Sequence, residues 1–272
     1  MTPGSESSIT ARYLEQIGVR ESPRATCPFD PGYDPATLEG HIEQSGHLLG
    51  TVKISMACWM VAEESASRRK IQAVTRRGIP AVAGGGPFEV AMAQGALPAY
   101  LDLCAEMGIT RIECGEGFAA ANLKPEAIVR DAAVRELEVE FELGEKHSGS
   151  FTDESTRELI EEGKRWLEAG AVRLVVEARE SAEDVGLFSA QGEFEARQAD
   201  TLAEAFGLER LLFEAPNKAS QFALIDHFGP TVQLGNVRLE EVLRVEIYRR
   251  GLHSDAFRRA NLRPRRPADA AA

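Results

Sequence analysis

The order of apolar and amphipathic segments along the chain constrains its fold more than any other feature of the sequence. Short apolar runs that resemble buried strands alternate with longer segments whose composition is typical of helices. This alternation predicts an α/β protein in which helices cover a parallel sheet. The strand-like runs span residues 25–29, 51–56, 80–85, 109–115, 137–144, 171–178, 209–215 and 231–237. The helix-like segments span residues 34–48, 62–77, 88–107, 125–135, 153–169, 195–206, 217–227 and 239–250.

Eight runs of each kind predict a single-domain (β/α)₈ barrel of the TIM type. The length of 272 residues agrees, because such barrels commonly need about 250 residues. A doubly wound open sheet is the alternative, since the number of strands does not by itself close a barrel. We place the barrel in residues 24–260, with a flexible N-terminal segment over residues 1–23 and a flexible C-terminal tail over residues 261–272.

The balance of charge and the cysteine pattern exclude several classes of partner. The chain has 31 basic and 43 acidic residues, and the resulting net charge of −12 argues against binding to nucleic acid or to an anionic membrane surface. No apolar stretch is long enough to span a bilayer, and the N-terminus lacks the pattern of a secretory signal. The four cysteines have no CxxC spacing, so we expect free thiols. These features predict a cytoplasmic protein.

Charged residues collect at the carboxyl ends of the predicted strands. In the segment RLVVEARES (173–181), an apolar run is followed at once by Glu177, Arg179 and Glu180. The active site of a barrel of this type lies at the carboxyl ends of its strands, so these side chains should meet at one rim. The other predicted strands contribute Asp30, Lys53, Glu89, Glu113, Glu116, Glu142, Glu145, Lys146, Glu214 and Asn236 to the same set.

A rim with so many carboxylates requires a cation to offset their repulsion. Oxygen ligands suit Mg²⁺, whereas the scattered histidines and the lack of an HExxH motif argue against zinc. Each single glutamate could instead be a first-turn acid of the following helix. Interleaved lysine and arginine residues indicate that the ligand also carries negative charge, as a phosphate or carboxylate does.

Two glycine-containing segments are candidates for holding such an anion. The segment GGGPFE contains Gly85 and Gly86, which could form either an anion-binding nest of backbone N–H groups or only a tight turn. Gly235 and Asn236 precede a predicted helix, where they could hold a phosphate or only cap the helix. Cys114 fits a small buried residue better than a nucleophile, because no histidine is near it in the sequence.

Six segments resemble the phosphosulfolactate synthase family in their order and spacing. They are GGGPFEVAM, IECGEGF, FELGEKHSG, AGAVRLVVEARESAEDVGLFSAQGEF, LLFEAPNKASQFALIDHFGPTVQLGNV and YRRGLHSDAF, and the resemblance extends over residues 25–257. It implies a Mg²⁺-dependent (β/α)₈ barrel, a lyase that adds sulfite to phosphoenolpyruvate and gives 2-phospho-3-sulfolactate, which opens a route to coenzyme M. We also expect a homo-oligomer.

The resemblance and this chemistry together suggest roles for individual residues. Lys146 matches the last residue of the family's EvGkK-type segment and is our candidate for the acid that protonates C2 of the substrate. The candidates for substrate binding are Lys53, Arg179, Gly235, Asn236, Gly85 and Gly86. The candidate metal ligands, or their close neighbours, are Glu113, Glu142, Glu177 and Glu214.

The chain also departs from the family pattern. The segment VKISMACW replaces a glycine-rich vKfGwGTs segment, and Pro31, Glu145 and His253 stand where the family has basic residues. These departures leave two alternatives open: a related Mg²⁺-dependent enolate enzyme with another nucleophile or acceptor, and a non-catalytic barrel that binds or supports other molecules. We expect Lys146 to face the barrel opening and Glu145 to face away from it, because adjacent side chains of an extended segment point to opposite sides.

Overall fold

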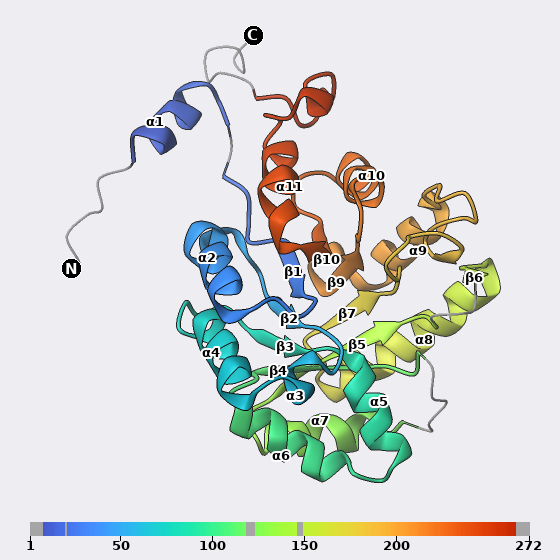
Figure 1. Cartoon of the computed structure of the whole chain (residues 1–272). Helices are drawn as coiled ribbons and strands as arrows, with labels where there is room; N and C mark the ends of the chain where they lie inside the picture. The colour runs from blue at the N-terminus through green and yellow to red at the C-terminus, as the bar shows by residue number, and fades with distance from the viewer. Residues whose placement is uncertain (1–7, 20, 118–122, 146–148, 265–272) are drawn as a thin grey trace.

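The fold is a closed parallel barrel, seen in a computed structural model that describes residues 8–19, 21–117, 123–145 and 149–264. Eight strands of these residues pair in the order β1-β10-β9-β7-β5-β4-β3-β2 (Figure 1). They are β1 (Thr26–Asp30), β2 (Val52–Ile54), β3 (Ala81–Ala83), β4 (Arg111–Cys114), β5 (Glu138–Leu143), β7 (Arg173–Val176), β9 (Leu211–Glu214) and β10 (Gln233–Arg238). Because β1 pairs with both β2 and β10, the barrel prediction is confirmed and the open sheet is wrong.

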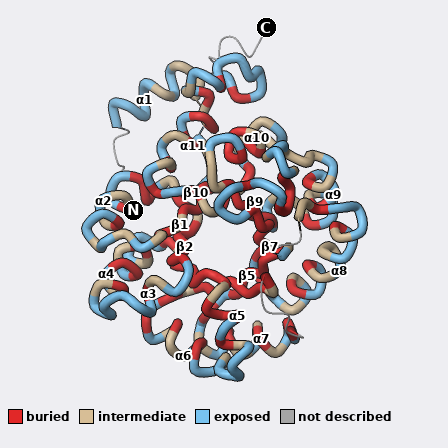
Figure 2. The backbone as a smooth tube through the Cα atoms, turned by 45° about the vertical axis from the view of Figure 1, so that its right-hand side comes forward, coloured by how far each residue is buried: buried red, intermediate tan, exposed pale blue. Residues whose placement is uncertain are grey.

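Helices form a layer around the strands, and Figure 2 shows the buried strands as a ring inside that layer. The helices are α2 (Pro35–Ser45), α3 (Cys58–Val61), α4 (Glu64–Thr75), α5 (Gly85–Ala93), α6 (Leu97–Met107), α7 (Pro125–Ala133), α8 (Asp153–Ala169), α9 (Ala196–Phe206), α10 (Lys218–Phe228) and α11 (Val242–Arg249). The main apolar core contains residues of both layers, among them Ile112, Trp166 and Phe213. Trp166 of α8, for example, stacks on Phe141 of β5 with the ring centroids 4.4 Å apart.

Local signals fix the ends of the helices that flank the barrel opening. Thr152 caps α8 in a reciprocal capping box with Ser155, and the helix ends at Gly170, whose φ of 110° favours glycine. Asn217 forms the same kind of capping box with Ser220 at the start of α10. The caps therefore fix where α8 and α10 begin along the chain after β5 and β9.

One predicted helix is divided in the structure, and another is preceded by a short helix that the sequence did not predict. The single helix predicted over residues 88–107 is wrong, because Gly95 has a φ of 65° and a turn there separates α5 from α6. The helix predicted over residues 62–77 corresponds to α4 alone, and the short helix α3 ends at Val61, before that segment begins. Helix α5 begins at Gly85, three residues earlier than predicted, so its N-terminus points toward the rim.

The structure adds elements outside the barrel. Helix α1 (Ile9–Gln16) lies within the predicted flexible segment 1–23, and none of its residues is buried. Strands β6 (Gly149–Ser150) and β8 (Val185–Gly186) pair in a small parallel sheet formed by two loops. At the other end of the chain, Leu262 is buried although the predicted tail begins at residue 261. None of the described helices combines the length and apolar character that a membrane span requires.

Side chains that point into the barrel form three layers. The middle layer is apolar and consists of Cys27, Val175 and Leu212. Toward the carboxyl ends of the strands lies a layer that we call the mouth cluster: Lys53, Glu113, Glu142, Glu177 and Glu214. Toward the amino ends lies a layer that we call the floor cluster: Thr51, Arg111, Glu138, Glu140 and Arg173. In both clusters most of the charged side chains are buried, with Glu138 as an exposed exception.

Candidate active site

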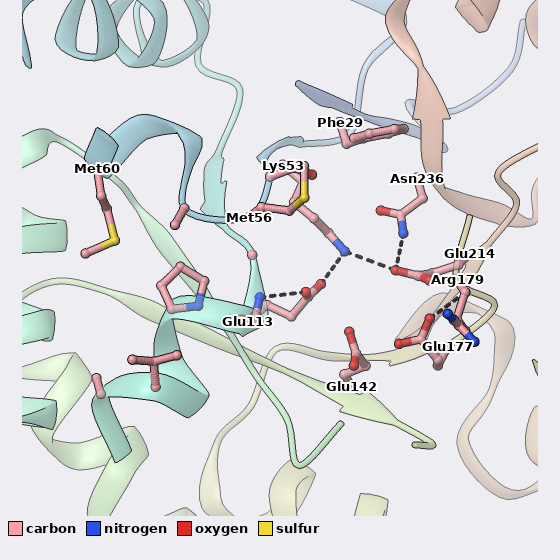
Figure 3. A pocket seen from close by; sticks show the side chains of 18 of the residues that line it. Phe29, Lys53, Met56, Met60, Glu113, Glu142, Glu177, Arg179, Glu214 and Asn236 are labelled. Carbon is pink, nitrogen blue, oxygen red and sulfur yellow. Dashed lines mark hydrogen bonds and ion pairs between the residues drawn. The ribbon is translucent and has the colours of Figure 1, made fainter. Parts of the chain in front are cut away.

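The mouth cluster is arranged around Lys53, whose side chain extends from β2 toward two glutamates. Lys53 Nζ lies 2.7 Å from Glu113 Oε2 and 3.1 Å from Glu214 Oε1 (Figure 3). Glu113, Glu142 and Glu214 are all buried, and one oxygen of each lies within 4.8 Å of the others. The side chains of β2, β4, β5 and β9 therefore converge on one point, as the strand-end pattern predicts.

Hydrogen bonds hold two of these carboxylates in fixed orientations. The N–H of Gly85, at the start of α5, donates to Glu113 Oε1 at 3.0 Å, and the positive end of the helix dipole favours a carboxylate there. The N–H of Ala178 donates to Glu214 Oε2 at 3.1 Å, and Asn236 Nδ2 donates to Glu214 Oε1. Both carboxylates are therefore preorganised by groups from helix α5, from the loop after β7 and from β10.

The mouth cluster holds more negative charge than Lys53 can offset. Burial and the adjacent Glu177 carboxylate raise the pKa of Glu214 to about 8, although Lys53 acts in the opposite direction. Burial disfavours the Lys53 ammonium, but the surrounding glutamates outweigh it and hold the pKa of Lys53 well above its ordinary value. A divalent cation would stabilise the charged carboxylates. The three converging oxygens are hard ligands of the kind that Mg²⁺ prefers, so the residues present fit this ion.

A pocket of about 1070 Å³ lies over the mouth cluster. Most of the predicted substrate-binding and metal-binding positions line it: Lys53, Gly85, Gly86, Glu113, Glu142, Glu177, Arg179, Glu214 and Asn236. Gly235 is placed differently, because it lies within β10 and faces the barrel interior, where a β-carbon would be 3.2 Å from the Leu212 side chain. Both residues belong to β10, in agreement with the strand predicted over residues 231–237, and their binding of a phosphate stays a prediction.

Arg179 lies at the edge of the pocket on the loop after β7. Its backbone N–H donates to Glu177 Oε1 at 2.5 Å, and its φ of 54° is uncommon for a residue other than glycine. The side chain is exposed and lines the pocket. The backbone contact therefore fixes the loop, and the guanidinium extends from it at the pocket wall.

One of the glycines after β3 contacts the mouth cluster directly, and substrate binding by Gly85 and Gly86 stays a prediction. The Gly85 N–H already donates to Glu113, so it orients a carboxylate of the mouth cluster. Gly84 is the residue before α5, and a β-carbon on it would lie 3.6 Å from Lys53 Cδ. A β-carbon there would make only ordinary van der Waals contacts, so the GGG segment contributes to the mouth cluster through the Gly85 N–H at the start of α5.

Several pocket residues were missed by the sequence analysis. Arg238 is the last residue of β10, one position beyond the predicted strand, and its Nη1 lies 3.8 Å from Glu240 Oε1. The signal that could have identified it is an arginine at the carboxyl end of a strand, two residues after Asn236. Phe29 and Ser55 also line the pocket, and no sequence pattern distinguished them.

Three residues that depart from the family pattern lie away from the described pocket wall, whereas Ser55, Met56 and Ala57 of the divergent VKISMACW segment line it. Pro31, Glu145 and His253 are not among its lining residues. Glu145 is exposed, and His253 packs at the edge of Tyr248 with a centroid distance of 5.8 Å. Lys146, the predicted acid, lies outside the described residues. The loss of basic side chains at Pro31, Glu145 and His253 therefore leaves the described wall unchanged.

Comparisons with known proteins identify the family of this chain. The family model described as (2R)-phospho-3-sulfolactate synthase (ComA) matches residues 20–255. The chain is 29% identical over 233 residues to the phosphosulfolactate synthase of Methanocaldococcus jannaschii, which covers 85% of this chain and 93% of that protein. It is 28% identical over 230 residues to the phosphosulfolactate synthase of Bacillus subtilis, which covers 84% of this chain and 90% of that protein.

A solved structure shows the same fold at much lower sequence identity. The structure of KGPDC from Streptococcus mutans has a TM-score of 0.52 and 12% identity, and the match covers 86% of this chain and 97% of that one. A likeness at this identity concerns the barrel alone. The family match extends over most of the chain and includes the strands that carry the mouth cluster. The chain therefore belongs to the (2R)-phospho-3-sulfolactate synthase family and is an enzyme of this type.

Proposed function

We propose that this enzyme catalyses the Mg²⁺-dependent addition of sulfite to phosphoenolpyruvate, which gives 2-phospho-3-sulfolactate. The observation that carries the proposal is the mouth cluster, in which three buried glutamates converge within 4.8 Å beside a single lysine. Such a site suits a divalent cation together with an anionic substrate. The names of the matched relatives supply the reaction, and the chemistry of the site is compatible with it.

The residues that would hold the ion are Glu113, Glu142 and Glu214, with Glu177 next to Glu214. When bound, Mg²⁺ supplies positive charge that stabilises negative charge developing on the substrate carboxylate. Lys53 keeps Glu113 and Glu214 in position, because its ammonium lies between their oxygens. Asn236 adds a second contact to Glu214 from β10.

The proposed reaction needs the enzyme to bring two anions together and to supply one proton. Sulfite attacks the methylene carbon C3 through its sulfur and forms the C–S bond. The electron pair of the C2–C3 double bond shifts toward C2 and the carboxylate, and a proton delivered to C2 completes the product without a leaving group. Arg179 and Arg238 line the pocket and can offset the repulsion between the two anions. Lys146 stays our predicted proton donor.

The direct test is product analysis with purified protein. Phosphoenolpyruvate, sulfite and Mg²⁺ are incubated with the enzyme, and mass spectrometry detects 2-phospho-3-sulfolactate. Parallel reactions omit sulfite or contain the Glu142→Gln variant. Failure to form the sulfonated ester in the complete mixture, with folded protein, would contradict the proposal.

The cellular location, the metabolic route and the oligomeric state of the enzyme stay predictions. We infer a cytoplasmic location and a role at the start of a route to coenzyme M, in line with the reaction proposed. We also infer a homo-oligomer, which light scattering coupled to size-exclusion chromatography would test. A monomer at working concentrations would contradict that inference without affecting the proposed reaction.

A further inference from the structure

The pocket over the mouth cluster is larger than the proposed substrates require. Its volume of about 1070 Å³ is at the upper end of pockets that bind drug-sized ligands, which run to about 1000 Å³. Phosphoenolpyruvate and sulfite are both much smaller than such ligands. Part of the pocket is therefore available to a chemical group that neither of them carries.

This additional space is apolar and lies to one side of the charged groups. We call it the apolar lobe and define it by Met56, Met60, Pro87, Val90, Tyr100 and Leu103. Helices α3, α5 and α6 contribute most of it, and none of these six described side chains is charged. Figure 3 shows Met60 on the opposite side of the pocket from Glu214 and Arg179. The lobe therefore adjoins the mouth cluster but differs from it in chemistry.

Several large apolar side chains of the lobe are accessible to solvent. Met56 is 53% exposed, Met60 is 45% exposed and Val90 is 53% exposed. Apolar side chains gathered in a concave site beside polar groups are typical of ligand pockets. Methionine is especially suited to this role, because its flexible thioether adapts to ligands of different shape. Such a surface does not stabilise a hydrated anion. An alkyl or aryl group is stabilised there because binding removes it from contact with water.

We propose that the apolar lobe binds an apolar substituent on C3 of the enol phosphate, so that the preferred acceptor is a 3-alkyl or 3-aryl homologue of phosphoenolpyruvate. The inference rests on the proposed function, since it keeps the reaction and changes only the acceptor. The position follows from chemistry: C1 is the carboxylate and C2 carries the phosphate. C3 is thus the carbon that can carry a substituent while both anionic groups stay at the charged side of the pocket.

The proposed step balances in the same way as the reaction with phosphoenolpyruvate. The sulfur of sulfite forms a bond to the substituted C3, and the electron pair of the double bond takes up a proton at C2. Nothing is oxidised or reduced, and no group leaves. The product is a 2-phospho-3-sulfo acid with a longer carbon chain.

Binding of unreactive probes tests the lobe independently of turnover. Isothermal titration calorimetry with Mg²⁺ present compares phospholactate with the O-phosphates of 2-hydroxybutanoate, 2-hydroxypentanoate and 2-hydroxyhexanoate. These saturated acids cannot accept sulfite. Each methylene that enters the lobe should lower the dissociation constant about fourfold, which corresponds to about 0.8 kcal/mol. A dissociation constant that stays constant or rises along the series overturns the inference.

Substitutions of two neighbouring residues on α3 test whether the gain in affinity with chain length arises in the lobe. Met60→Glu puts a carboxylate into the lobe and should abolish the gain in affinity with chain length. Val61→Glu is the matched control, because Val61 is the next residue, is 85% exposed and does not line the pocket. It should leave the chain-length dependence unchanged. Equal dependence in both variants would show that the probes do not use the lobe.

Turnover then separates failure of this inference from failure of the proposed function. With sulfite and Mg²⁺, a higher kcat/KM for the enol phosphate of 2-oxohexanoate than for phosphoenolpyruvate supports the lobe as a determinant of specificity. Turnover of phosphoenolpyruvate with rejection of the homologue overturns the inference and leaves the proposed function intact. Faster reaction of phosphoenolpyruvate with butanesulfinate than with sulfite would also overturn it, because the apolar group would then belong to the nucleophile. If neither acceptor reacts, the proposed function fails, and the calorimetric series alone decides whether the lobe binds alkyl groups.

Discussion

Glu140 and Glu214 are both buried glutamates of the barrel interior, yet their pKa values shift in opposite directions. Burial alone would raise the pKa of Glu140, but the Arg173 and Arg111 guanidiniums outweigh it and lower that pKa. The Glu140 carboxylate lies 2.8 Å from Arg173 Nε and 3.4 Å from Arg111 Nη1. Glu214 has only Lys53 as a cationic partner among the described residues and shares it with Glu113, so its pKa rises to about 8.

These opposite pKa shifts distinguish the floor cluster, which stabilises the fold, from the mouth cluster, which is a candidate active site. In the floor cluster, two arginines face Glu138 and Glu140, and Arg173 Nη2 also donates to Thr51 Oγ1 at 3.0 Å. Its charges are balanced within the protein, as a buried ionic network requires. The mouth cluster leaves an excess of negative charge at the end of the barrel where active sites lie. An imbalance of this kind, at this end, is compatible with the cation that we propose for the site.

Removal of divalent cations should have the largest effect and should act on the mouth cluster alone. We expect EDTA to abolish turnover and Mg²⁺ or Mn²⁺ to restore it, because the converging glutamates need a hard cation to act on the substrate. Steady-state rates before and after dialysis against chelator measure this. Full activity in thoroughly chelated protein would show that the mouth cluster needs no divalent cation. The contrast between a cation-binding mouth cluster and a self-balanced floor cluster would then be wrong.

Glu142→Gln and Glu140→Gln make the same chemical change two residues apart on β5 and should have different consequences. In the mouth cluster, Glu142→Gln should lower kcat/KM by about 10³-fold, on the scale expected for loss of one preorganised electrostatic group. Its urea midpoint should stay within error of the wild type or rise, because it removes one of several like charges. A midpoint that falls with normal kcat/KM would assign Glu142 a structural role.

In the floor cluster, Glu140→Gln should destabilise the protein by about 3 kcal/mol, because it leaves two buried guanidiniums with less compensation. Chemical denaturation followed by tryptophan fluorescence gives the free energy of unfolding. The kcat/KM of the folded fraction should change far less than in Glu142→Gln. Loss of turnover without loss of stability would show that the floor cluster also takes part in catalysis.

Arg179→Lys tests the rim of the pocket with a smaller expected effect. An ammonium cannot reproduce the two-pronged contact of a guanidinium with an anion, so substrate affinity should fall by about 1–3 kcal/mol. Unfolding should be unaffected, because the Arg179 side chain is exposed and its contact with Glu177 is made by the backbone. A lower melting temperature with normal affinity would instead make Arg179 a structural residue.

The pH dependence of stability should show the smallest effect. The folded-state pKa of Glu140 is lowered, so its contribution is fully present above the unfolded-state pKa of a glutamate and is lost as pH falls through the folded-state pKa. The stability difference between the wild type and Glu140→Gln should therefore narrow in acid. Unfolding free energies of both proteins across the acidic range measure it. A difference that widens as pH falls contradicts the assignment.

Much of the fold and of the mouth cluster could be predicted because their signals are local. Apolar runs locate the barrel strands, and the charged residues that follow them identify Glu113, Glu142, Glu177 and Glu214. These signals are informative because all strands of a parallel barrel end at the same rim. The rim residues can therefore be identified without knowing which strands are neighbours. Breaks between helices were harder to predict, since the turn at Gly95 interrupts a segment whose composition is typical of a helix throughout.

The sequence by itself determined the alternation of strands and helices, the approximate bounds of the strands and the excess of carboxylates at their carboxyl ends, whereas the pairing of β1 with β2 and β10 showed that the sheet closes into a barrel. Only the tertiary structure decided the partners: Glu140 faces Arg173 across β5 and β7, while Glu214 meets Lys53 from a strand 161 residues away in sequence. It also decided that the Gly85 N–H orients Glu113 and that Met60 and Val90 line one lobe. The physical reason is that partners depend on the register between strands and on how separate helices pack, and neither is contained in the periodicity of any single segment.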